Sequence, residues 1–219
     1  MSTMIARECA NLHIKTHTNL FASLFVKKAL IIGTVLLLSG CGINNIPTFD
    51  EGVDAAWSEV QNQYKRRADL VPNLIETVKG FAAQEKEVFI EVTEARAKVS
   101  QMNVSPEMLS DPAAFKQFQQ NQAGLGGALS KLMLVAERYP DLKSNENFLQ
   151  LQNQLEGTEN RIAVARGDYI KKVQRYNTEL RTIPGRWWKK FMYAESTEKE
   201  TFTIDEAETA NPSVNFNNN

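Results

Sequence analysis

The fold class is decided by residues 145–183, which read NENFLQLQNQLEGTENRIAVARGDYIKKVQRYNTELRTI. Apolar residues or Thr recur there in steps of three or four, at positions 148, 151, 155, 158, 162, 165, 169, 173, 176, 180 and 183. This spacing keeps one stripe on one face of an α-helix and contradicts the period of two of a strand. A helix from Asn145 to Thr182 would be ~57 Å long at 1.5 Å per residue, a length typical of a bundle or coiled coil.

Three segments further towards the N-terminus carry the same spacing. Residues 49–67 have apolar side chains at Val53, Trp57, Val60 and Tyr64. Residues 71–102 continue the pattern with one interruption, at Glu85, and we expect Pro72 to end or kink the preceding helix. Residues 112–138 are predicted to form a further helix. The sequence therefore predicts an all-α, antiparallel up-and-down bundle of about four long helices.

The junctions between these helices are predicted from capping residues and loops. Asp111 is the expected N-cap of the helix that begins at Pro112, and Ser144 is the expected start of the last helix. Residues 103–110 and 139–144 are expected to be loops.

The N-terminal region has the features of a membrane signal. Lys27 and Lys28 precede an uncharged apolar run, residues 29–38, which is followed by Ser39-Gly40-Cys41. A basic region, a short apolar run and a small-residue cleavage site are typical of a secretory signal peptide. Leu38-Ser39-Gly40-Cys41 is similar to a bacterial lipobox, in which the Cys41 thiol is lipidated. The alternatives are an uncleaved signal anchor and a buried core helix.

The predicted organisation has four parts. Residues 1–25 fit a signal poorly, and we expect them to precede the native start, with Val26 as an alternative initiator. Residues 26–41 are the predicted signal or anchor, residues 48–184 the helical bundle, and residues 185–219 a flexible C-terminal tail, with an extended piece near residues 201–204. The lysines before the apolar run predict that the bulk of the chain lies outside the cytoplasm, in the bacterial envelope.

Composition excludes most catalytic designs. The whole chain has 25 Lys and Arg, 26 Asp and Glu and a net charge of −1, which gives no basic excess for nucleic acid. Both histidines, His13 and His17, and the first cysteine, Cys9, precede the predicted cleavage site. Without them the chain has no histidine for a Ser-His-Asp or Cys-His site or for a zinc centre. We therefore expect no cofactor and no metal.

Carboxylates are the remaining candidates for catalysis. A hydrolase or metal-dependent enzyme would use the glutamates on two predicted helices, which are Glu85, Glu87, Glu91, Glu94, Glu156 and Glu159. Most of these lie at the spacing of a solvated helix surface. Glu85 falls within the apolar stripe, where Arg67 and Arg96 could also reach. Such an inward ion pair is more typical of a device that fixes helix register than of a catalytic acid.

Two further motifs have a functional and a structural interpretation. Residues 124–127, Gly-Leu-Gly-Gly, resemble a phosphate loop in composition alone, since no strand precedes them and the Lys-Ser/Thr ending is missing; close helix packing is the alternative. A basic aromatic segment comprises Arg186, Trp187, Trp188, Lys189 and Lys190. It would suit a lipid headgroup surface or a partner, or its tryptophans could fold back and cap the bundle.

Two long motifs carry a family resemblance. The first runs from Arg66 to Leu74 and on through Val78-Lys79-Gly80-Phe81, and the second from Leu155 to Ala163, with Tyr139-Pro140-Asp141-Leu142-Lys143 between them. These motifs resemble the LemA family. The resemblance implies a helical bundle held to a bacterial membrane by its N-terminus, without established enzymatic activity and without catalytic residues to transfer. Relatives often begin with a plain transmembrane helix, so Cys41 departs from the family pattern.

The resemblance also implies structural roles for motif residues. Asp69 and Asn73 are expected to bond free backbone groups where the first helix gives way to the second. Glu159, Asn160 and Arg161 are expected to join a polar network with Arg67, Glu85 and Arg96. The resulting hypothesis is a non-enzymatic interaction or scaffold protein. Its expected partners are the lipid bilayer, through the N-terminus, and an unidentified envelope protein.

Overall fold

A computed structural model describes residues 42–102 and 104–203, and every regular element in these ranges is helical. The elements are α2 (Asn45–Lys79), α3 (Lys86–Ser100), the 3₁₀-helix η1 (Pro106–Ser110), α4 (Pro112–Glu137), α5 (Pro140–Lys143), α6 (Glu146–Arg181) and α7 (Gly185–Phe191). The prediction of an all-α fold is confirmed. The predicted signal, anchor and lipidation site, residues 1–41, lie outside the described residues.

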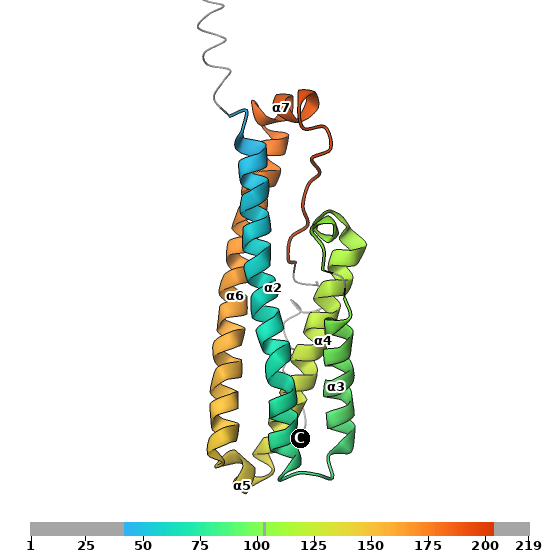
Figure 1. The fold of residues 1–219 in the computed structure, drawn as a ribbon, viewed down its shortest axis with the longest axis vertical. Helices are drawn as coiled ribbons and strands as arrows, with labels where there is room; N and C mark the ends of the chain where they lie inside the picture. The colour runs from blue at the N-terminus through green and yellow to red at the C-terminus, as the bar shows by residue number, and fades with distance from the viewer. Residues whose placement is uncertain (1–41, 103, 204–219) are drawn as a thin grey trace, which may run out of the picture.

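The long helices run side by side in an elongated molecule (Figure 1). The two longest, α2 and α6, run next to each other in opposite directions, and α3 lies against α4. The start of α2 and the short helix α7 lie at one end, while α5 lies at the other. The chain therefore enters the helical region at the same end at which α7 is placed.

The core has two parts, stacked along the long axis. One part is aromatic: Trp57 lies 5.2 Å from both Phe118 and Tyr169, measured between ring centroids. The other is mainly aliphatic and includes Val71, Leu129 and Leu132. Each part buries the apolar stripes that the sequence predicts, and burial of these side chains is the main source of stability.

Pro72 does not end the first helix, which was one of the two expected effects of this proline. The α2 helix continues through Pro72 to Lys79, and the next long helix begins only at Lys86. Proline removes the N–H that would bond the carbonyl of residue i−4, here Ala68. In the structure Arg96 Nε donates to Ala68 O at 3.0 Å, so a side chain from α3 replaces the missing backbone donor. The predicted single helix over residues 71–102 is therefore wrong.

The other helix ends follow the capping residues closely. Asp111 Oδ1 accepts hydrogen bonds from the backbone N–H groups of Ala113 and Ala114, which confirms it as the N-cap of α4. Asn145, one residue later than the predicted Ser144, caps α6 by accepting from Phe148 N at 3.1 Å. The two predicted loops contain η1 and α5. The glycine-rich residues 124–127 lie within α4, so they form no phosphate loop.

Residues 185–203 pack against the long helices, whereas we predicted a flexible tail over residues 185–219. They form α7 and then an irregular segment that runs back along the helices. The segment is held by Asn177, whose side chain bonds both the N–H and the C=O of Lys199, and by Tyr169, whose hydroxyl donates to Glu200 O at 2.8 Å. Phe202 is buried in the aromatic part of the core.

Candidate functional site

A polar layer separates the two parts of the core. In the described ranges the buried polar or charged side chains are Arg67, Gln122 and Thr158. They come from α2, α4 and α6, and in each helix the neighbouring stripe residues belong to the aromatic part on one side and the aliphatic part on the other. The three helices thus place one polar residue each at the same level of the bundle.

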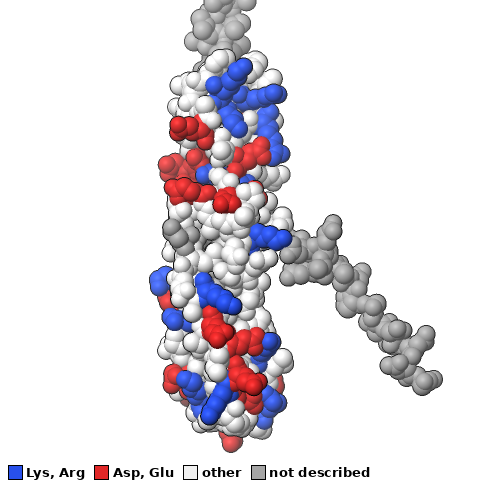
Figure 2. Space-filling model, turned by 90° about the vertical axis from the view of Figure 1, so that its right-hand side faces the viewer, with Lys and Arg blue, Asp and Glu red and all other residues white. Residues whose placement is uncertain are grey.

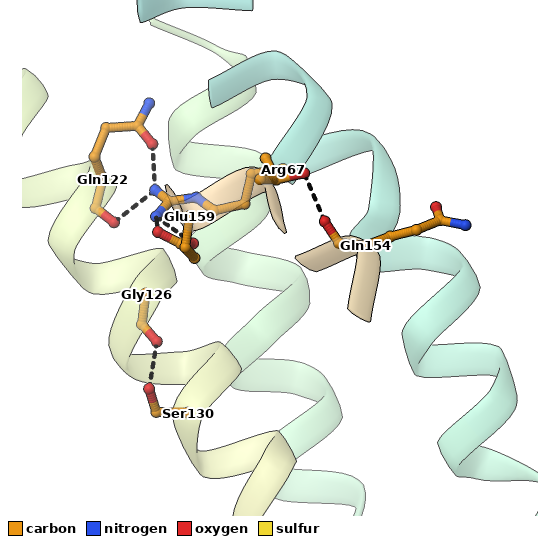
Figure 3. Close-up of polar contacts among 7 residues, drawn as sticks. Arg67, Gln122, Gly126, Ser130, Gln154 and Glu159 are labelled. Atoms are coloured by element: carbon orange, nitrogen blue, oxygen red, sulfur yellow. Dashed lines mark hydrogen bonds and ion pairs between the residues drawn. The ribbon is translucent and has the colours of Figure 1, made fainter. Parts of the chain in front are cut away.

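Arg67 is the centre of this layer. Its side chain is 5% exposed, and it extends from α2 between α4 and α6 (Figure 3). Nη1 donates to Glu159 Oε1 at 3.1 Å, while Nη2 donates to Gln122 O at 3.0 Å and to Gln122 Oε1 at 2.6 Å. The guanidinium also lies 5.0 Å from the ring centroid of Tyr64. These contacts join three helices through one cation.

The energetics of the layer favour a role in helix register. A buried charge costs desolvation energy, which hydrogen bonds and an ion partner offset, so such pairs add little net stability but penalise misaligned packing. Glu159 is 45% exposed and remains in contact with water. Arg67 Nε has no hydrogen-bond partner among residues 42–102 and 104–203. This atom is buried, so the described residues leave one donor of the guanidinium unpaired inside the layer.

A cleft of about 410 Å³ opens beside Arg67. Its walls come from α2, α4, α6 and the segment 200–203. The polar lining residues include Arg67, Lys116, Gln119, Gln120, Gln122, Glu159 and Arg166, and the aromatic ones are Tyr64, Phe115 and Phe202. Burial raises the pKa of Tyr64, so this hydroxyl stays protonated. Amide, hydroxyl and guanidinium groups above an aromatic base suit the binding of a polar chain better than they suit bond cleavage.

Glu85 belongs to a different group of residues. It lies at the N-cap position of α3, where Tyr139 donates its hydroxyl to Glu85 Oε1 at 3.0 Å and Arg138 forms an ion pair with Oε2 at 3.1 Å. Burial, together with the Glu85 hydrogen bond, raises the pKa of Tyr139. The expected network that joins Glu85 to Glu159 is therefore not formed, because Glu85 bonds Arg138 and Tyr139, the two residues that follow α4.

The remaining residues of the predicted network are placed separately. Asp69 is exposed and pairs with Lys65 at 2.9 Å, and Asn73 is also exposed. Their expected capping role is wrong, because α2 has no end at this point. Arg96 bonds Ala68 O, as described above. Asn160 and Arg161 lie on the exposed face of α6, and neither is among the hydrogen-bond or ion-pair partners of Arg67 in the described ranges.

The carboxylates of the enzyme hypothesis do not form one site. Glu91 pairs with Lys131, Glu156 accepts from Gln152 on its own helix, and Glu159 pairs with Arg67. Within the part of the chain that the structure describes, no three His, Cys, Asp or Glu side chains come close enough to hold a metal ion.

The residues of the basic aromatic segment are divided between the structural and the functional interpretation. Trp188 packs against the aromatic part of the core, as a capping side chain would. Trp187 is 55% exposed, and Arg186 and Lys190 are exposed beside it. Among the helices in the described ranges, none combines the length and apolar composition needed to cross a bilayer.

Sequence reasoning missed Gln122 and Phe202. Gln122 occupies a position in the apolar stripe of α4 between Phe118 and Leu125, and this polar interruption could have indicated an inward side chain. Phe202 is an aromatic residue between two threonines in a segment that otherwise resembles a polar tail. A single aromatic residue in a polar segment was only a weak indication that the segment packs against the helices.

Comparison with known proteins agrees with this architecture. A family model described as the LemA family matches residues 56–216. Among the similar proteins are the magnetosome proteins MamQ 2 and MamQ 1 of Paramagnetospirillum magneticum, each 26% identical over 157 residues, and MamQ of Magnetospirillum gryphiswaldense, 24% identical over the same length. Each match covers 64% of this chain and 58% of the relative, so less than two thirds of each relative is represented. The chain belongs to the LemA family.

Proposed function

We propose that the protein is a non-enzymatic helical-bundle protein of the bacterial envelope, tethered to a membrane by its N-terminus, that holds a partner protein in the cleft beside Arg67. The tether would be either a lipid attached to Cys41 after cleavage of the signal, or the apolar run of residues 29–38 retained as an uncleaved anchor. The proposed bundle is antiparallel and up-and-down, and its bulk would lie outside the cytoplasm. The proposed domain organisation keeps residues 48–184 as the bundle and 26–41 as the tether.

The observation that carries this proposal is the construction of the cleft. Three helices and the segment 200–203 bring a buried cation, several amides and an aromatic base to one concave surface. Extended backbone of a partner offers the carbonyls and N–H groups that such side chains bind. Membership of the LemA family and the similarity to proteins named for the magnetosome support an envelope role rather than a metabolic one.

Photo-crosslinking in intact cells tests the proposal. A photoreactive amino acid at Gln120, which lines the cleft, would be compared with the same residue at Gln174, which is exposed on α6. We expect a discrete crosslinked protein from position 120 that is missing from position 174. Equal labelling from both positions would refute the cleft as the interaction site. Fractionation of a chain without residues 29–38 tests the tether, because that protein should leave the membrane fraction.

A further inference from the structure

We propose that α7 forms a membrane-contact surface that binds anionic phospholipid headgroups. This inference rests on the proposed tether, which it extends by assigning the end of the molecule that faces the bilayer. The surface is defined by Arg186, Trp187, Lys190 and Phe191.

One side of α7 is fixed to the bundle. Gly185 is buried, and a Cβ placed there would collide with the backbone carbonyl of Glu179, so the start of α7 lies directly against the end of α6. Trp188, three residues later, packs against the aromatic part of the core. These two contacts set the rotation of α7 about its own axis.

The opposite side of α7 carries the aromatic residues that remain exposed. Trp187 and Phe191 are 55% and 76% exposed, and their spacing of four residues places them on one face. Ile183, which lies just before α7, is also exposed, at 65%. Large exposed aromatic side chains on one face are costly in water and indicate a surface that another phase or molecule covers.

Basic residues flank this aromatic face. Arg186 and Lys190 are exposed and also four residues apart, and each charged residue within α7 is basic. Figure 2 shows Lys and Arg side chains gathered at the upper end of the molecule, the end of α7 in Figure 1, with acidic side chains below them. Tryptophan and basic side chains together are favoured at the headgroup level of a bilayer with anionic lipids.

The position of α7 relative to the chain entry favours a membrane over a protein as the occupant. Asn45 Nδ2, at the start of α2, donates to Glu179 Oε1 at 3.1 Å, so the first described residues lie beside the end of α6 and the start of α7. The apolar run ends at Leu38, and the four residues from there to Gly42 span at most ~14 Å. A tether inserted in a bilayer would hold this end of the molecule at the membrane surface.

Depth-dependent quenching of tryptophan fluorescence tests the proposal. The full chain would be reconstituted into vesicles of phosphatidylcholine with or without phosphatidylglycerol, with brominated acyl chains as the quencher. The difference between the native chain and the Trp187→Phe variant isolates the signal of Trp187, because Trp57 and Trp188 contribute to the fluorescence of both proteins. We expect bromolipid quenching of Trp187 that is stronger in the anionic vesicles.

Charge reversal gives the decisive comparison. Arg186→Glu/Lys190→Glu should remove the Trp187 quenching and lower the affinity of the surface for anionic vesicles by more than tenfold, since one basic residue contributes about fivefold. Lys86→Glu/Lys98→Glu, an equal charge change on exposed residues of α3, should leave the quenching unchanged. Quenching that survives the α7 variant, or that is missing in the native chain, would overturn the proposal and favour an acidic protein partner.

Flotation of the same vesicles distinguishes failure of the α7 surface from failure of the proposed tether. The α7 variant should still float with the vesicles, because its tether is unchanged. A native chain that does not float would contradict the tether. In that case quenching of Trp187 on addition of excess anionic vesicles would still decide whether α7 contacts lipid.

Discussion

The hydrogen bond from Arg96 to Ala68 O explains how α2 passes through Pro72, and it yields a quantitative prediction. Removing the guanidinium in Arg96→Met keeps most of the side-chain stem but leaves a carbonyl without a donor in a residue that is 6% exposed. An unsatisfied buried polar group costs about 1–3 kcal/mol. Pro72→Ala restores the backbone N–H that bonds Ala68 O. In the Pro72→Ala protein, Arg96→Met should therefore lower the free energy of unfolding by clearly less.

A double-mutant cycle measures this dependence. The four proteins would be unfolded in urea, and we expect the two substitutions to be coupled by about 1 kcal/mol or more. Each 1 kcal/mol corresponds to a shift in Tm of about 2–4 °C for a chain of this size. Lys98→Met, on the exposed face of α3, is the matched control and should show no coupling to Pro72→Ala. A coupling energy near zero for Arg96 would refute the replacement of the backbone donor.

Three further predictions concern the core, the polar layer and the buried tyrosines. Phe202→Ala should lower the free energy of unfolding by about 3 kcal/mol, because the Phe202 ring packs on Trp57, Phe115 and Tyr169. Phe191→Ala, at a 76% exposed position, should change it by less than about 0.5 kcal/mol. Equal effects of the two substitutions in urea denaturation would contradict packing of residues 200–203 on the helices. Gln122→Leu should destabilise the fold by about 1.5–3 kcal/mol by removing an acceptor from the buried Arg67, and the exposed Gln120→Leu should not, as thermal denaturation would report. Burial raises the pKa of Tyr176 to about 12, so the unfolded chain, with its tyrosine pKa near 10, releases this proton first. The stability from Tyr176 is therefore complete below pH 10 and is lost between pH 10 and 12, and Tyr176→Phe should make that decline shallower; an unchanged slope would count against the shift.

The sequence was sufficient to predict that the chain forms long helices, but not to predict where each helix ends. The stripe of residues 148–183 predicted α6 almost to its ends, because a long amphipathic period leaves little choice of structure. The predicted helix end at Pro72 was wrong for a local reason: a proline lacks a donor, and the compensating donor, Arg96, lies 24 residues further along the chain. Such a tertiary contact cannot be inferred from local spacing.

The residues of the candidate site were likewise only partly predictable from the sequence. Arg67 and Glu159 were both named as polar residues of a network, and the structure pairs them directly. Glu85 was assigned to the same network because it interrupts the apolar stripe, yet the interruption reflects the turn between α2 and α3. The contribution of Gln122 and the closing of the cleft by Phe202 depend on helix rotation and on a returning segment, which the helical period does not determine.

The central claim is that the molecule stands on a membrane with its α7 end towards the lipid and its α5 end away from it. The most direct measurement is energy transfer to acceptor-labelled lipids from a dye placed by a genetically encoded amino acid, either at Arg186 or at Asp141 in α5. The 36 residues of α6 separate these ends by about 54 Å. We expect strong transfer from position 186 and weak transfer from position 141. Equal transfer from both positions, or stronger transfer from position 141, would contradict it.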